Sequence, residues 1–181
     1  MADGFLLSAF LFFKKRNPKK RGVLLSVLKP DFRFNCILDI KPEDIKNSGA
    51  KFVLLDTDNT LALHGSQEPL KGVLEWIDEM RKNGIEPILL SNNSRERIEP
   101  FAKKLGVPFV YKSAKPLSKG FSIACKKLSA KPEETAVIGD QIFTDVLGGK
   151  LFGSKVFLTE PIGPETNAFI KFKRIIEKFI R

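Results

Sequence analysis

The chain has 181 residues, 43% of them hydrophobic and 29% charged, which is enough for one globular domain with a sizeable core. Its two cysteines, Cys36 and Cys125, match no metal-binding spacing and are typical of reduced thiols in a cytoplasmic protein. The single histidine, His64, excludes a histidine-based catalytic triad unless His64 itself serves, and its neighbours indicate an ordinary loop residue.

The net charge of +10 is concentrated at the two ends of the chain. Residues 1–21 carry +5 and residues 171–181 carry +4, so the other 149 residues carry only +1. A nearly neutral domain with two basic ends indicates an electrostatic partner that the ends meet. We expect a basic and apolar extension, residues 1–28, followed by a single domain, residues 29–181.

The extension joins an apolar run, residues 5–13, to a basic run, residues 14–21. The apolar run is far shorter than the roughly 20 residues that span a bilayer. The charge follows the apolar run, which does not suit a signal peptide. Such a segment could lie in the interface of an anionic membrane, where each cation adds about 1 kcal/mol; packing of the apolar run on its own domain is the alternative. We expect a cytoplasmic protein that could contact the inner face of the membrane peripherally through residues 5–21.

In chain order, residues 22–49 come first, and their prolines predict several short elements that lead into the domain. From residue 51 onward, apolar runs alternate with helical patterns, which predicts a parallel sheet. The expected strands are residues 52–55, 88–90, 109–111, 135–138 and 155–158. The expected helices are residues 69–83, 95–105, 116–128 and one after residue 141 that stops at Gly148 and Gly149. This order predicts an α/β fold with a central parallel sheet of about five strands.

Carboxylates follow two of the expected strands. Asp56 and Asp58 come directly after the first, while Asp140 follows the fourth and Asp145 lies about one helical turn further on. In open α/β sheets, ligands bind at the carboxyl edge of the strands, so these acids are candidates for a site. Three or more converging carboxylates repel strongly unless a divalent cation neutralises them, and all-oxygen ligands select Mg²⁺ over Zn²⁺. The alternative for Asp56 and Asp58 is a loop of turn-forming residues.

Two further residues at the same edge suit a phosphoryl group. Ser91 follows the second expected strand, and Lys115 begins the helix before the fourth. A hydroxyl, backbone amides after a strand and one ammonium group suit phosphoryl oxygens. The chain has no Gly-x-x-x-x-Gly-Lys-Ser/Thr loop and no Gly-x-Gly-x-x-Gly, so it is not built to hold ATP or a dinucleotide.

Four motifs together resemble the haloacid dehalogenase (HAD) superfamily of phosphohydrolases. They are Asp56-Thr-Asp-Asn-Thr60, Leu90-Ser-Asn92, Lys115-Pro116 and Gly139-Asp-Gln-Ile-Phe-Thr-Asp145, in the family's order. Over about residues 29–163 the sequence is more closely similar to the YqeG-type subfamily, class IIIA, although Thr57 replaces the larger apolar residue expected there. The resemblance implies a Rossmann-like, three-layer HAD fold.

The resemblance also implies roles for the acids. Asp56 would attack phosphorus and form an aspartyl-phosphate, and Asp58 would act first as general acid and then as general base. Mg²⁺ would be held by an Asp56 oxygen, the Asp58 backbone carbonyl and Asp140. Asp145 would complete the metal shell or orient Lys115.

The phosphoryl oxygens would be held by Ser91, Asn92 and Lys115, and Thr60 would brace the loop. Only about 30 residues separate Thr60 from Ser91, and about two dozen separate Ser91 from Lys115. Helix and strand use up nearly all of both gaps, so no cap domain fits. An uncapped site is open to a phosphate carried on something large, such as a lipid bilayer, a protein or a nucleic acid.

Three hypotheses remain open for the function. The YqeG-like resemblance extends to phosphatidylglycerophosphate phosphatases, and basic, apolar ends beside an uncapped site fit that membrane substrate. In the C-terminal segment, residues 169–181, an apolar stripe supports it weakly, since a last helix that packs on the sheet explains the stripe as well. The second hypothesis is the same chemistry on a soluble, protein or nucleotide phosphate. The third is a nucleic-acid-binding module with a vestigial site, against which the complete set of acids counts.

Overall fold

The computed structural model describes residues 26–164 of the chain. The membrane-facing segment expected at residues 5–21 and the apolar stripe expected at residues 169–181 lie outside the described residues, as does most of the extension 1–28. Among the helices within residues 26–164, none is both long enough and apolar enough to cross a bilayer.

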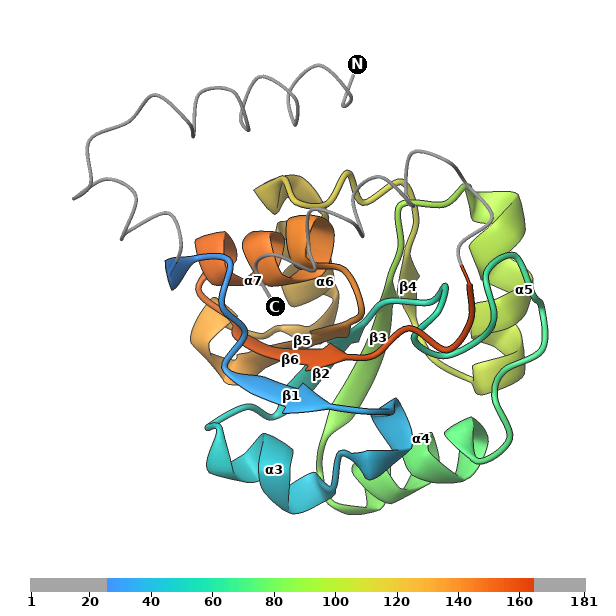
Figure 1. Ribbon diagram of the computed structural model, residues 1–181, viewed down its shortest axis with the longest axis horizontal. Helices are drawn as coiled ribbons and strands as arrows, with labels where there is room; N and C mark the ends of the chain where they lie inside the picture. Colours follow the sequence, from blue (N-terminus) through green and yellow to red (C-terminus); the bar gives the residue numbers. More distant parts are fainter. Residues whose placement is uncertain (1–25, 165–181) are drawn as a thin grey trace.

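Six parallel strands form the central sheet, in the order β1-β6-β5-β2-β3-β4 (Figure 1). The strands are β1 (Phe32–Phe34), β2 (Phe52–Leu55), β3 (Glu86–Leu90), β4 (Phe109–Val110), β5 (Thr135–Gly139) and β6 (Lys155–Thr159). The central strands β2 and β5 are buried along nearly their whole length and are mostly apolar, because helices cover both of their faces. Leu55 pairs with Ile138, so β2 and β5 end side by side.

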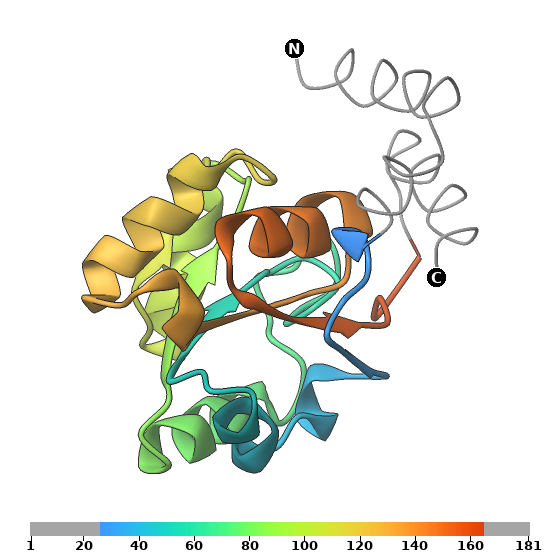
Figure 2. The ribbon, with the colours of Figure 1, turned by 90° about the vertical axis from the view of Figure 1, so that its left-hand side faces the viewer.

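Helices cover both faces of the sheet and complete a three-layer fold. On one face lie α3 (Pro42–Asn47), α4 (Val73–Lys82) and α5 (Arg95–Leu105); on the other lie α6 (Ser118–Leu128) and α7 (Leu147–Phe152), which follows the π-helical segment η3 (Ile142–Val146). Figures 1 and 2 show α6 and α7 on the face opposite α3 and α4. Short 3-10 turns, η1 (Ile37–Asp39) and η2 (Pro132–Glu134), precede α3 and β5. The predicted Rossmann-like arrangement is confirmed.

The buried residues alternate between the two faces along each strand. Val53 and Leu55 pack with Ile77 and Phe101 in the larger core, on the side of α3, α4 and α5. Leu54, between them in sequence, packs in the second core beneath α6. Successive side chains of a strand point to opposite faces, so a four-residue strand supplies both cores.

Strand β1 is a sixth strand that comes from the segment predicted only as short lead-in elements. Phe32 and Phe34 stack on Phe157 of β6, with ring centroids 4.5 and 6.0 Å apart. The Asp31 carboxylate accepts a hydrogen bond from the Val156 N–H at 2.8 Å and forms an ion pair with Lys150 at 2.5 Å. Three residues are too few to show an alternating pattern, so contacts to β6 define this strand.

The helix expected to stop at Gly148 and Gly149 continues instead through both glycines to Phe152, and the cap residue Gly153 has a left-handed φ of 93°. A Cβ at Gly149 would lie 2.8 Å from the Val156 side chain, and a Cβ at Gly148 would lie 2.7 Å from Phe121. The two glycines therefore allow α7 to approach the sheet and α6 closely rather than ending the helix. The helices predicted to begin at residues 69 and 116 also begin slightly later, at Val73 and Ser118.

Candidate active site

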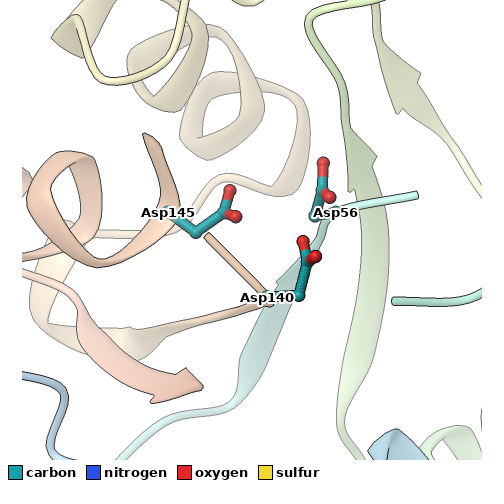
Figure 3. Close-up of side chains that lie close together, drawn as sticks. All are labelled: Asp56, Asp140 and Asp145. Carbon is teal, nitrogen blue, oxygen red and sulfur yellow. The ribbon is translucent and has the colours of Figure 1, made fainter. Parts of the chain in front are cut away.

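Three carboxylates meet at the carboxyl edge of the two central strands. Asp56 directly follows β2, Asp140 directly follows β5, and Asp145 lies in η3. Each offers an oxygen atom within 4.8 Å of the others, and all three residues are buried (Figure 3). The Asp56 N–H donates to the Ile138 carbonyl at 2.9 Å, so the β2–β5 ladder continues into the site. This hydrogen bond fixes the Asp56 backbone, from which the side chain extends into the site.

Lys115 places its ammonium nitrogen between two of these acids, 2.6 Å from Asp56 Oδ1 and 2.7 Å from Asp145 Oδ1. The lysine side chain is only 3% exposed. Burial alone would lower the pKa of Lys115, but the carboxylates of Asp145 and Asp56 outweigh it and raise that pKa. The ammonium group is therefore charged across the physiological range.

Asp56 has a strongly perturbed carboxyl group. Burial raises its pKa from 3.8 to about 7, against the opposing effect of Lys115, and the negative charges of Asp145 and Asp58 add to the increase. Perturbed pKa values with identifiable charge partners are typical of functional sites. Three buried acids and one buried ammonium group leave excess negative charge at this edge.

Asp145 is held in place by contacts to both of its oxygens. Oδ1 accepts from Lys115, while Oδ2 accepts from the Gln141 N–H at 3.1 Å and the Thr144 hydroxyl at 3.3 Å. Gly139 makes this possible, because a Cβ at position 139 would overlap the Asp145 carboxyl group. The carboxylate of Asp145 therefore has a defined orientation toward Lys115.

The loop that carries Lys115 is fixed mainly by Asn92. The Asn92 Oδ1 atom accepts from the Lys115 N–H at 2.7 Å and from the Ser113 hydroxyl at 2.8 Å, and its Nδ2 donates to the Lys115 carbonyl at 3.2 Å. Ser91 is buried at the end of β3, where its carbonyl accepts from the Ser113 N–H at 3.0 Å and its Oγ accepts from the Asn93 N–H at 3.3 Å. Asn92 therefore contacts the Lys115 backbone directly, and Ser91 contacts Ser113, two residues before Lys115.

The Asp58 side chain lies outside the cluster of three acids. Its Oδ2 accepts from Asn93 Nδ2 at 2.6 Å, and its Oδ1 accepts from Arg97 Nη2 at 3.0 Å and the Gly65 N–H at 3.1 Å. His64 Nδ1 is 3.9 Å from Oδ2, so the predicted loop histidine borders the site. The predicted contribution of Asp58 to metal binding involved only its backbone carbonyl, which these contacts leave unaffected.

Thr57 and Thr60 are buried within the tight turn after β2. The Thr57 carbonyl accepts from the N–H groups of Thr60, Leu61 and Ala62 at 3.4, 3.0 and 3.2 Å. Among the described residues, neither threonine hydroxyl has a hydrogen-bond partner. Thr60 therefore takes part in the turn through its backbone, whereas the sequence alone did not specify how it would brace the loop.

Arg97 and Asn93 are site residues that the sequence analysis missed. Asn93 follows the predicted Ser91-Asn92 pair, so its position at the sheet edge was a usable signal. Arg97 lies in α5 within the run Arg95-Glu-Arg97, which is typical of a solvated helix surface. Only the packing of α5 beside the turn after β2 brings its guanidinium group to Asp58.

The donor set of the acid cluster fits a divalent cation. It consists entirely of carboxylate oxygens, the ligands that hard cations such as Mg²⁺ and Mn²⁺ prefer. A divalent ion would also offset the excess negative charge that burial makes costly.

The chain belongs to the haloacid dehalogenase-like hydrolases, since the model of that hydrolase family matches residues 32–153. It is 36% identical to the probable phosphatase YqeG of Bacillus subtilis over 151 residues, covering 83% of this chain and 88% of that protein. It is 26% identical over 144 residues to the mitochondrial phosphatidylglycerophosphatase GEP4 of Saccharomyces cerevisiae, covering 72% and 78% of the two chains.

A solved structure supports the same fold. The cobalt-bound deoxy-D-mannose-octulosonate 8-phosphate phosphatase of Haemophilus influenzae matches with a TM-score of 0.51 at 18% identity, over 74% of this chain and 90% of that one. Together with the family match, these similarities identify the chain as a HAD-type phosphatase. Phosphatases of this family use a divalent metal, and the cluster of Asp56, Asp140 and Asp145 is a group of acids that could hold one.

Proposed function

We propose that the chain is a Mg²⁺-dependent phosphomonoester hydrolase that works through an aspartyl-phosphate on Asp56, with phosphatidylglycerophosphate at the membrane surface as its substrate. The observation that carries the catalytic part is the buried ion pair of Asp56 with Lys115 at 2.6 Å, beside Asp140 and Asp145. This ion pair places the proposed nucleophilic oxygen beside a cation that suits the transferred phosphoryl group.

In the first step, an Asp56 carboxylate oxygen attacks phosphorus and the bond from phosphorus to the ester oxygen breaks. Asp58 donates a proton to the departing alkoxide, so the alcohol leaves neutral. Lys115 and the Ser91 hydroxyl stabilise the charge on the phosphoryl oxygens. Asn92, whose side chain is engaged with the Lys115 backbone, holds that lysine and offers its backbone N–H to the same oxygens.

In the second step, water attacks phosphorus and Asp58 takes one of its protons. The bond from phosphorus to Asp56 breaks, which releases inorganic phosphate and restores the Asp56 carboxylate. General acid–base catalysis of this kind contributes typically about 10²–10⁴-fold. Asp145, with both oxygens in hydrogen bonds, orients Lys115, and Thr60 maintains the turn that carries Asp56 and Asp58.

Mg²⁺ would be held by Asp56, the Asp58 backbone carbonyl and Asp140. It would polarise the phosphoryl group and offset the negative charge of the cluster. Asp145 is the remaining acid of the set, and its contacts to Gln141 and Thr144 favour the orienting role over direct ligation.

Three observations support a lipid substrate. The segments between β2 and β3 and between β3 and β4 each carry a single helix, α4 and α5, so neither holds a cap domain. The similarity to a yeast phosphatidylglycerophosphatase covers 72% of the chain. The basic ends, residues 1–21 and 171–181, carry +5 and +4, suited to an anionic bilayer. In this proposal residues 1–28 are an extension of the phosphatase domain, and residues 5–21 contact the inner face of the membrane peripherally.

The test measures Mg²⁺-dependent phosphate release from phosphatidylglycerophosphate in anionic vesicles and from a panel of soluble phosphate esters. We expect the wild type to favour the lipid strongly and Asp56→Asn to release no phosphate. A variant with the basic residues of segment 14–21 changed to Gln should lose activity on vesicles but not on soluble esters.

Activity confined to soluble esters would overturn the membrane substrate and leave the chemistry in place. Release that persists in Asp56→Asn would contradict the assignment of the nucleophile. If neither protein releases phosphate from any ester, the nucleic-acid-binding alternative takes precedence, and salt-dependent RNA binding would be measured next.

A further inference from the structure

Arg97 connects Asp58 to the segment that follows it in the chain. Its Nη2 atom donates to Asp58 Oδ1 at 3.0 Å and to the Ser66 carbonyl at 2.6 Å. The guanidinium carbon lies 5.9 Å from the centre of the Phe101 ring, one turn further along α5. The Arg97 side chain is 18% exposed, so its position is set by packing as well as by charge.

The segment after Asp58 is attached to α5 at several points. Gln67 Nε2 donates to the Arg97 carbonyl at 2.9 Å, and Lys104 forms an ion pair with Glu68 at 2.6 Å. Arg97 is the point of this attachment that also reaches the Asp58 carboxylate. The position of Asp58 therefore depends on a residue of a helix on the larger-core side of the sheet.

The second terminal nitrogen of Arg97, Nη1, is buried and has no hydrogen-bond partner among the described residues. An unsatisfied buried donor carries a desolvation cost, so attachment of the segment alone explains this arginine poorly. The Arg97 contact that reaches a proposed catalytic group is the hydrogen bond from Nη2 to Asp58 Oδ1, so the effect of Arg97 on the reaction is exerted through Asp58.

We propose that Arg97 is a positioning residue that aims the Asp58 carboxyl group at the leaving-group oxygen. The proposal rests on the proposed role of Asp58 as general acid and base. Asn93 holds the other Asp58 oxygen at 2.6 Å, so the two contacts together fix the plane of the carboxyl group. A small displacement of a catalytic group can cost about 100-fold in rate, which sets the scale of the expected effect.

The test compares two esters that differ in how much they need a proton from Asp58. An alkyl phosphate has a poor leaving group, whereas an aryl phosphate such as p-nitrophenyl phosphate leaves readily without protonation. We expect Arg97→Gln to lower kcat/KM about 10- to 100-fold for the alkyl ester and only a few-fold for the aryl ester. This quantity reports formation of the phosphoenzyme and is independent of its later hydrolysis.

Two further variants keep the result interpretable. Arg97→Met retains an unbranched side chain against Phe101, and it replaces Arg97→Gln if that variant does not fold. Arg95→Gln is the matched control, because Arg95 lies on the same helix but pairs with Glu99 at the surface. Its kcat/KM values should match the wild type for both esters.

Asp58→Asn separates failure of this inference from failure of the proposed function. In the Asp58→Asn background, adding Arg97→Gln should change neither ester further, because Arg97 acts only through Asp58. Equal losses for both esters, wild-type values for both, or an additional loss in the double variant would each overturn the positioning role. If Asp58→Asn itself leaves the difference between the esters unchanged, the role of Asp58 in the proposed function is wrong.

Discussion

Lys115 is the residue on which the charge balance of the site depends. Its ammonium group lies within 2.7 Å of both Asp56 and Asp145, and all three side chains are at most 10% exposed. Removing one partner of a buried ion pair leaves the other charge without compensation. Here two acids would be left together, beside Asp140.

We expect Lys115→Met to abolish phosphatase activity and to lower the free energy of unfolding by about 3–5 kcal/mol near pH 8. The loss should be smaller near pH 5.5, because Asp56, whose pKa burial raises to about 7, can then take up a proton. Urea denaturation in the presence of EDTA measures both values. Lys119→Met, at an exposed position of α6, serves as control and should leave stability and activity unchanged. A loss that is independent of pH would show that the acids are not the cause.

For single residues, the sequence predicted which side chains converge at the sheet edge but not which of them contact one another. Asp56, Ser91 and Asp140 come together because each follows a strand of one parallel sheet, a consequence of topology alone. The contact of Asp58 with Arg97 depends on how α5 packs against the turn after β2, and this packing cannot be predicted from the spacing of residues in the sequence. The same limit applies to Asn92, predicted at the phosphate but also engaged with the Lys115 backbone.

Among the elements, α7 shows how close packing produces a misleading sequence signal. Glycine usually ends a helix, yet Gly148 and Gly149 lie inside α7 because there is no room for a side chain beneath it. The strands were easier to predict, since a continuous apolar run between two turns is typical of a strand covered on both faces. Edge strand β1 was missed because its three residues are mostly exposed and held by Asp31 and Phe157.

We expect Gly149→Ala to destabilise the protein by roughly 1–3 kcal/mol, although alanine favours helices, because its Cβ would overlap the side chains of Val156 and Val137. Leu151→Ala on the same helix is the control; Leu151 is 65% exposed, so its change should be within about 0.5 kcal/mol. The midpoints of urea denaturation of the wild type, Gly149→Ala and Leu151→Ala measure these changes in stability. A Gly149→Ala variant as stable as the wild type would show that the helix can shift away from the sheet.

For the whole molecule, proton binding by Asp56 is coupled to stability. The pKa of Asp56 is about 7 in the folded chain against an ordinary value of 3.8, so the folded chain binds this proton more tightly than the unfolded chain. The stabilisation from this proton is fully present below about pH 3.8 and is lost as the pH rises through about 7. A divalent cation held by the same carboxylate, as we propose, would compete with this proton.

Mg²⁺ should therefore raise the unfolding temperature more near pH 8 than near pH 5.5. At a concentration about 100-fold above its dissociation constant, a ligand that binds only the folded state stabilises it by about 2.7 kcal/mol. Thermal melts with MgCl₂ and with EDTA at both pH values measure the difference. Asp56→Asn should lose most of the response at either pH. An equal response at the two pH values would show that the cation does not compete with the Asp56 proton.

The pairing of β2 with β5 also makes the proposed catalysis depend on completed folding. Asp56 takes its place through a hydrogen bond to Ile138, and its partner Lys115 lies 59 positions away in sequence. A chain still being synthesised, or one arrested before these strands pair, holds an aspartate like any other in water. In the proposed mechanism hydrolysis requires Asp56 and Lys115 to be in contact, so we expect incompletely folded molecules to be inactive. Specific activity during refolding would accordingly count the molecules that have completed the sheet.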